Sequence, residues 1–308
     1  MDELTLVREL RADAPAAAPS GARDVLLAEL RPPRRSRARW LVSAAAVLAL
    51  GAGGLVALQT GPGASPSAAA VLQRAAAVVA DDVVERPRDD QWVFETMYGG
   101  ATVGEPFEMI PGEAWTRFDG TQFAGGPSDR PGKLLVQDLV DDPEIPTPEE
   151  WYDGAAALPA EPAALLAALR DGDLADAKGP TEAARDFDAV VETLGQPLLP
   201  AQARANLFRA LATIHGVGID EDARPDLLDR PVLSVTFDGV PDVTGIESRR
   251  EMLLDPHTYA YVGTRVTALE AGHIGAAGDP GFDLTPGETW YESTVLPAAV
   301  VDRPGQRP

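Results

Sequence analysis

Residues 40–58 read WLVSAAAVLALGAGGLVAL and contain no charged side chain. At a rise of about 1.5 Å per residue, this stretch forms a helix of roughly 28 Å, close to the hydrocarbon thickness of about 30 Å. Its flanks differ, because no acidic residue but five arginines lie directly before it, namely Arg31, Arg34, Arg35, Arg37 and Arg39. The first basic residue after it is Arg74. Since positive charge stays on the cytoplasmic side, the sequence predicts one transmembrane helix with a cytoplasmic N-terminus.

The transmembrane helix divides the chain into four parts. We expect a cytoplasmic segment over 1–39, the helix over 40–59, a linker over 60–68 and an extracytoplasmic domain over 69–308. A cleaved export signal is the alternative, because Arg34-Arg35 resembles a twin-arginine signal and Ser67-Ala68-Ala69 is small enough for cleavage. The long N-terminal segment favours an anchor, and the predicted location is the cell membrane.

Composition excludes several classes of protein. The net charge of -22 argues against nucleic acid as a partner, because acidic protein surface repels the phosphate backbone. The absence of cysteine excludes disulfides, thiol catalysis and cysteine-bound zinc. With 45% hydrophobic residues, the chain can still bury a globular core.

The cytoplasmic segment contains two short apolar patterns. Leu4, Leu6, Val7 and Leu10 form the first, and Val25, Leu26, Leu27 and Leu30 form the second. Neither is long enough to fold alone, so each is either without stable structure or ordered on a partner or a membrane. We take Leu4, Leu6, Val7 and Leu10 as candidate partner-binding residues.

The remaining residues show segregated helix and strand patterns. Helices are expected over 69–80, 162–170, 181–194 and 200–214, with Gly195 and Gly216 as C-caps. Strands are expected over 91–98, 113–123 with a turn at Asp119-Gly120, 133–137, 232–237, 246–254, 260–266 and 289–296. This pattern predicts an α+β domain with a curved antiparallel sheet and packed helices.

The sequence resembles a family of actinobacterial single-pass membrane proteins often encoded beside extracytoplasmic-function sigma factors. The resemblance rests on the opening MDELTLVRELRADAP, on LPAEPAALL at 158–166, on LP at 199–200 leading to LFRAL at 207–211, and on LDPHTYAYVG at 254–263. It implies a membrane-anchored regulator whose outer domain resembles the lipoprotein-carrier or RseB-like fold. Well-understood anti-sigma factors carry a His-x-x-x-Cys-x-x-Cys zinc motif, which this chain lacks.

No pattern in the sequence indicates an enzyme, a metal site or a cofactor. The segment 171–182 has acids at positions 1, 3 and 12 of a calcium loop, but Asp176 replaces the glycine required at position 6. Nucleophile-elbow, phosphate-loop and dinucleotide motifs are absent. We therefore expect no catalytic activity and no cofactor.

Aromatic residues in the expected strands offer a candidate binding site. Trp92, Phe94, Trp115 and Trp290 could line an apolar cleft, although strand aromatics more often form core. The sequence thus favours a membrane regulator or sensor that binds a ligand outside and a sigma factor inside. The alternative is a membrane-tethered carrier of an apolar ligand with no regulatory N-terminus.

Overall fold

The computed structural model describes residues 66–101, 111–126, 134–139, 146–172, 174–175, 179–240, 245–274 and 281–308. All of them belong to one compact unit, Leu58–Pro308. The predicted transmembrane helix at 40–59 and the N-terminal residues Leu4, Leu6, Val7 and Leu10 lie outside the described residues. Within the described ranges, no helix combines the length and the hydrophobicity that crossing a bilayer requires.

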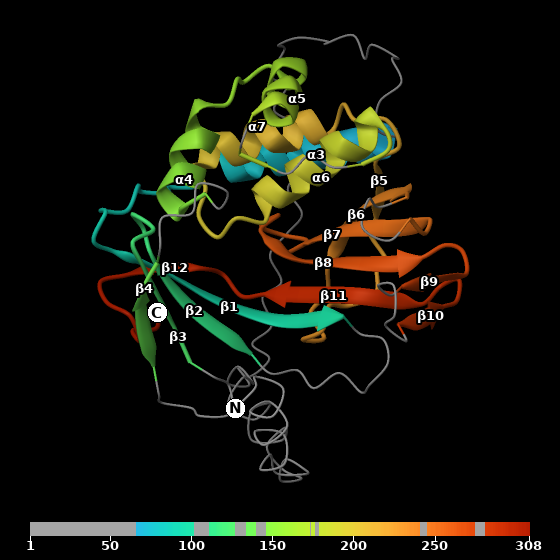
Figure 1. The fold of residues 1–308 in the computed structure, drawn as a ribbon. Helices are drawn as coiled ribbons and strands as arrows, with labels where there is room; N and C mark the ends of the chain where they lie inside the picture. Colours follow the sequence, from blue (N-terminus) through green and yellow to red (C-terminus); the bar gives the residue numbers. More distant parts are fainter. Residues whose placement is uncertain are drawn as a thin grey trace, which may run out of the picture. The chain divides into compact units, whose positions relative to one another are not determined.

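A ten-stranded antiparallel sheet forms the framework of this unit (Figure 1). The strand order is β4-β3-β2-β1-β11-β8-β7-β6-β5, and β12 pairs with the start of β1. The strands are β1 (Trp92–Ala101), β2 (Gly112–Arg117), β3 (Gln122–Gly125), β4 (Leu135–Asp138), β5 (Gly218–Asp220), β6 (Leu233–Gly239), β7 (Ser248–Leu254), β8 (Tyr261–Ala268), β11 (Thr289–Val295) and β12 (Ala299–Val301). A separate hairpin joins β9 (Gly272–Ile274) to β10 (Phe282–Leu284).

Five helices in the described residues gather on one side of the sheet (Figure 1). They are α3 (Pro66–Ala80), α4 (Pro148–Ala157), α5 (Pro162–Asp171), α6 (Glu182–Leu194) and α7 (Ala201–Leu211). Side-chain caps fix several starts: the Thr181 hydroxyl accepts from the Ala184 amide, and the Glu161 carboxylate accepts from the Ala164 amide. These bonds satisfy amides that have no partner within the helix.

The sequence analysis does not predict α4. Its sequence, PEEWYDGAAA, has too few apolar residues for a clear helical period. The start signal is nevertheless present, since Thr147 and Glu150 form a reciprocal capping box with Pro148 at the first turn. The cap, rather than the periodicity, is the local cause of this helix.

The main core lies between the helices and strands β6 and β7. Helix α7 is at its centre and packs against α3, α5 and α6. The side chains of Leu72, Leu207, Leu211 and Met252 are fully buried there. Buried alanines on α3 and α7 let these two helices pack closely against each other.

The expected α+β class with an antiparallel sheet is confirmed, and the expected helices and long strands are present. Gly195 caps α6 as expected. The helix expected over 200–214 ends earlier, at Leu211 with Ala212 as its C-cap, so Gly216 with φ of 89° lies in the following turn instead. Strands β5, β9, β10 and β12 were not expected, because three residues are too few to show an alternating pattern.

Candidate functional site

A cavity of about 440 Å³ lies between the sheet and the segment that follows α6. Strands β1, β8 and β11 form its floor, and residues 194–199 form one wall. Its apolar lining includes Met97, Leu194, Leu198, Leu199 and Val295, and its polar lining includes Glu95, Arg204, Tyr261, Thr264, Tyr291 and Ser293. Small-molecule sites in proteins have this size range and this mixture of mostly apolar walls with a few polar groups.

Two glycines let the neighbouring strands approach β11, the central strand of the cavity floor, closely. Gly99 in β1 and Gly263 in β8 pair with Ser293 and Thr294, on opposite edges of β11. Both have positive φ, 125° and 152°, and a Cβ at either position would lie within 2.3 Å of a β11 carbonyl oxygen. Only glycine permits this backbone approach. The floor between them carries small side chains, with the Thr264 and Ser293 hydroxyls 3.1 Å apart.

Glu95 places an acidic group in this cavity. It lies between Val93 and Met97 on the helix-facing side of β1, and its carboxylate has no hydrogen-bond or ion-pair partner among the described residues. Burial raises the pKa of the Glu95 carboxyl above its ordinary value. The cavity therefore contains an acidic group whose charge the described protein does not balance.

The other ionisable groups of the lining are differently placed. The Arg204 guanidinium donates to Asp82 at 2.8 Å, while its buried Nε has no partner among the described residues. Burial raises the pKa of Tyr261 to about 12, so its phenol is neutral at physiological pH. Met97 leaves 49% of its surface exposed, which places it at the open side of the cavity.

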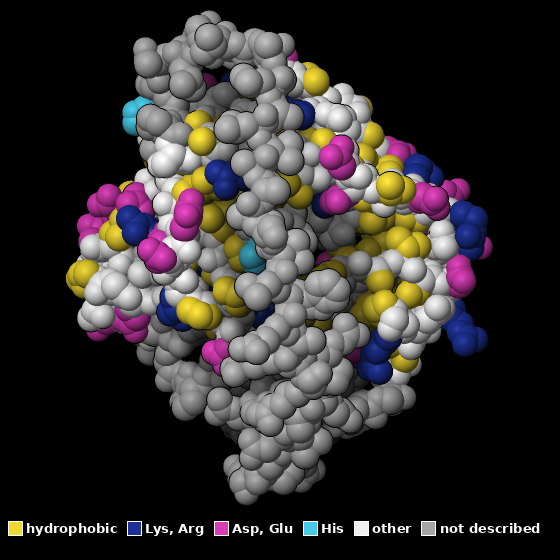
Figure 2. All heavy atoms as spheres, turned by 180° about the vertical axis from the view of Figure 1, so that it is seen from behind, with side chains coloured by type: hydrophobic (Ala, Val, Ile, Leu, Met, Phe, Trp, Pro, Cys, Tyr) yellow, Lys and Arg dark blue, Asp and Glu magenta, His cyan; other side chains and the backbone are white. Residues whose placement is uncertain are grey.

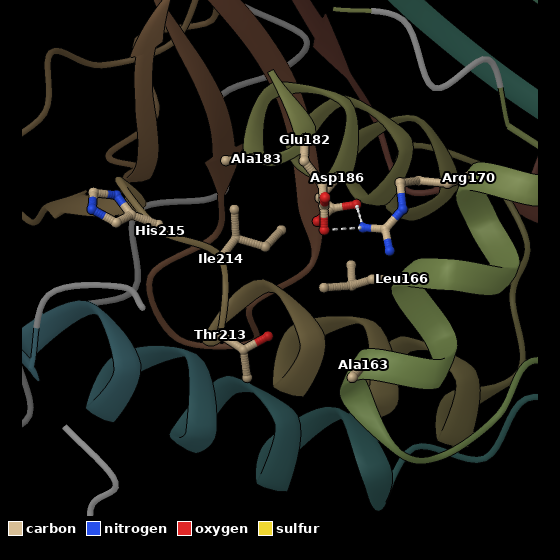
Figure 3. Close-up of a pocket in the computed structure, with 9 residues that line it drawn as sticks. All are labelled: Ala163, Leu166, Arg170, Glu182, Ala183, Asp186, Thr213, Ile214 and His215. Atoms are coloured by element: carbon tan, nitrogen blue, oxygen red, sulfur yellow. Dashed lines mark hydrogen bonds and ion pairs between the residues drawn. The ribbon is translucent and has the colours of Figure 1, made fainter. Parts of the chain in front are cut away.

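A second hollow, of about 330 Å³, lies between α5, α6 and the end of α7 (Figure 3). Arg170 reaches across from α5 and contacts Asp186 at 2.6 Å and Glu182 at 3.1 Å. Desolvation raises the pKa of Asp186, and Arg170 opposes that effect. Because these charges pair with one another and His215 lies apart from them, we interpret this cluster as a link between helices rather than a binding site.

Three of the four residues of the expected aromatic cleft form a small core instead. Trp92, Phe94 and Trp115 are each less than 10% exposed, and the Phe94 and Trp115 rings stack with centroids 4.8 Å apart. They lie on the sheet face opposite the cavity, since Glu95 and Phe94 alternate along β1. The C-terminal segment covers them, and Trp115 Nε1 donates to the Gln306 carbonyl at 2.7 Å.

Trp290 lies in a different place from the other three. It packs with Ile246, Ala268 and Leu284, where β7, β8 and the small hairpin meet. The four aromatic residues therefore do not line one cleft. Sequence reasoning also missed the real cavity, although one signal was available: Val93, Glu95 and Met97 share a strand face, and an acid between two apolar residues is unusual there.

The described residues contain no group of three or more His, Cys, Asp or Glu side chains that could hold a metal ion. Glu182, the last position of the calcium-like segment, pairs with Arg170. The candidate partner-binding residues Leu4, Leu6, Val7 and Leu10 lie outside the described ranges. A comparison with protein-family models, curated proteins and solved structures finds no match for the chain.

One face of the molecule carries a mixed surface. On the face seen in Figure 2, acidic and basic side chains lie side by side near the margins, with hydrophobic side chains between them. Such interspersed charge is typical of a solvated surface, and most exposed pairs on it contribute little to stability. The cavity beside Glu95, with its apolar lining and an acid that has no partner among the described residues, is the stronger candidate site.

Proposed function

We propose that the domain after the linker is a binding module for a small apolar or amphipathic molecule. The observation that carries this proposal is the cavity of about 440 Å³ on the helix-facing side of β1, β8 and β11. The cavity is large enough for a small ligand.

The distribution of polarity in the cavity supports an amphipathic ligand. Leu194, Leu198 and Leu199 would contact an apolar body, while Glu95 and the Thr264 and Ser293 hydroxyls could orient a polar end. Burial of apolar ligand surface would provide most of the affinity, at about 25 cal/mol per Å² before the costs of association. The few polar groups would provide the specificity.

The membrane setting of this module rests on the sequence alone. We propose that the helix at 40–59 anchors the chain and that the binding domain lies outside the cell membrane, as the arginine-rich flank predicts. A sensor that passes ligand occupancy to a sigma factor bound at Leu4, Leu6, Val7 and Leu10, and a tethered carrier, both require such a ligand site. The binding site is therefore the part to test first.

A neutral fluorescent apolar probe, N-phenyl-1-naphthylamine, offers a direct test with the purified full chain. The probe should bind with a fluorescence increase, and Met97→Trp should weaken binding at least severalfold, because the larger ring would occupy the open side of the cavity. Val136→Trp is the matched control, since Val136 is 50% exposed on β4, outside the cavity lining. Probe binding that is absent, or equally affected by both substitutions, would contradict the proposal.

A further inference from the structure

Glu95 differs from every other acidic residue in the described strands. Each of the others has a hydrogen-bond or ion-pair partner within the described ranges: Glu113 with Arg307, Asp138 with Gln122, Asp220 with the Asp222 amide, Asp238 with Arg249, Glu251 with Arg265, Asp283 with His273 and Glu292 with Arg265. Glu95 alone among them has none.

This contrast is informative because Glu95 is partly buried, and a carboxylate that loses part of its contact with water is destabilised when no counter-charge lies beside it. The pairs on the opposite sheet face show that this chain can supply arginines to its strands, since Arg265 and Glu292 are both only 2% exposed and lie 2.8 Å apart. Among the described residues, no arginine forms an ion pair with Glu95. A group that costs stability and has no structural partner is a candidate for contact with a ligand.

The remaining lining groups do not neutralise Glu95. Arg204 lines the same cavity, but its guanidinium is paired with Asp82. Tyr261 and Tyr291 also line the cavity, and a phenol group offers a hydrogen bond but no positive charge. The net charge of -22 also attracts cations toward the domain and repels anions.

We propose that the ligand of this cavity carries a basic nitrogen beside its apolar body, and that this cation pairs with the Glu95 carboxylate. The inference rests on the proposed binding function and specifies the chemical class of the ligand. Leu198 and Met97 would contact the hydrocarbon portion, and Glu95 would select an ammonium group over a neutral or anionic head.

Three probes with ten carbon atoms each test this selection. Decylammonium, 1-decanol and decanoate, each below its micelle concentration, would compete with N-phenyl-1-naphthylamine for the full chain at pH 7 and low salt. Decylammonium should bind about tenfold or more tightly than decanol, as expected for one charge-assisted hydrogen bond. Decanoate should bind more weakly than decanol, because Glu95 would repel its carboxylate.

The matched variants are Glu95→Gln and Glu221→Gln. Glu95→Gln should remove the preference for decylammonium over decanol, because the amide has nearly the same volume as the carboxylate but no charge. Binding of N-phenyl-1-naphthylamine by the same variant verifies that the cavity is intact. Glu221→Gln makes the same change in net charge on an exposed turn and should keep the preference.

Four results would count against the inference. Equal binding of decylammonium and decanol by the unaltered chain would overturn it and leave the proposed function standing, as would a preference that survives Glu95→Gln. Tighter binding of decanoate would overturn it in favour of an anion at Arg204. Failure of all probes to bind would overturn the proposed function together with the inference.

Discussion

The two ends of the ten-stranded sheet are held in different ways. Side chains of strands β6 and β7 join one continuous core with residues from all five described helices, including Leu72, Leu207 and Leu211. Strands β1, β2 and β3 have on one face only a small aromatic cluster, which the last residues of the chain cover. The stability of the helix-covered end depends on the amount of buried apolar surface. The stability of the aromatic end depends on a few hydrogen bonds and ring contacts.

At the aromatic end of the sheet, several residues of the C-terminal segment form hydrogen bonds or ion pairs with the rest of the chain. Asp302 accepts hydrogen bonds from Arg88 and Gln91, the Gln306 carbonyl accepts from Trp115, and Arg307 donates twice to Glu113, at 2.8 and 2.6 Å. Exposed ion pairs such as that of Arg307 contribute little and are screened by salt. The comparison implies that substitutions in the helical core should have the larger effects.

The largest effect is expected for Leu207→Ala in α7. Leu207 is fully buried where α7 meets its neighbours, so the substitution leaves a cavity and should lower the free energy of unfolding by about 2 to 5 kcal/mol. Urea unfolding of the purified chain measures this loss. Val78→Ala on the 40% exposed face of α3 is the control and should cost much less. Similar losses in the two variants would show that α7 is not the centre of the core.

An intermediate effect concerns a charge pair within the helical end. Asp188 on α6 contacts Arg250 on β7, whose guanidinium lies near the rings of Phe187 and Phe237. Burial raises the pKa of Asp188 from 3.8 to about 6, although Arg250 opposes the shift. Between these two pH values the folded chain binds the proton more strongly than the unfolded chain. The contribution of Asp188 to stability therefore falls as the pH rises.

The direction of this pH dependence can be measured with Asp188→Asn, because the asparagine side chain does not titrate. The free energy of unfolding of the unaltered chain minus that of Asp188→Asn should decrease by about 1 to 3 kcal/mol as the pH rises from about 4 to 7. Asp222→Asn, on an exposed turn, controls for the loss of one carboxylate. A difference that stays constant over this range would mean that Asp188 titrates alike in the folded and unfolded chains.

The smallest effect, and the one specific to the aromatic end, is expected for Trp115→Phe. It removes the donor to the Gln306 carbonyl and part of a buried ring, so the free energy of unfolding should fall by about 1 to 2 kcal/mol. Trp290→Phe is a matched control, because the buried Nε1 of Trp290 has no partner among the described residues. Its loss should cost less or even stabilise the fold. Equal losses at both positions would show that the contact with the C-terminal segment is unimportant.

Local signals account for what could be predicted from the sequence. The alternation around Trp92 and Phe94, the Asp119-Gly120 turn and the helical spacing of Phe187, Val190 and Leu194 depend only on residues close in the chain. Helix α4 could also have been found, because its capping box at Thr147 and Glu150 is a local signal. The apolar residues whose spacing predicts an element are also the ones that pack into the core. These predictions therefore agree with the observed elements.

The candidate site could not be predicted, because it is formed by contacts between residues that are far apart in the sequence. Strand β1 pairs with β11 through Met97 and Val295, nearly 200 residues apart, and only that pairing forms the floor of the cavity. Whether Trp92, Phe94 and Trp115 formed a cleft or a core was likewise decided by the C-terminal segment, which reaches them only in the folded chain.

The sequence by itself determined the α+β class and the main helices and strands, because periodicity and turn chemistry act over a few residues. The tertiary structure alone decided which sheet face the helices cover, and therefore that Glu95 faces a cavity while its neighbour Phe94 faces a closed aromatic core. The physical reason is that successive strand residues point to opposite faces of the sheet. Which segment covers each face depends on packing between parts of the chain that are far apart in the sequence.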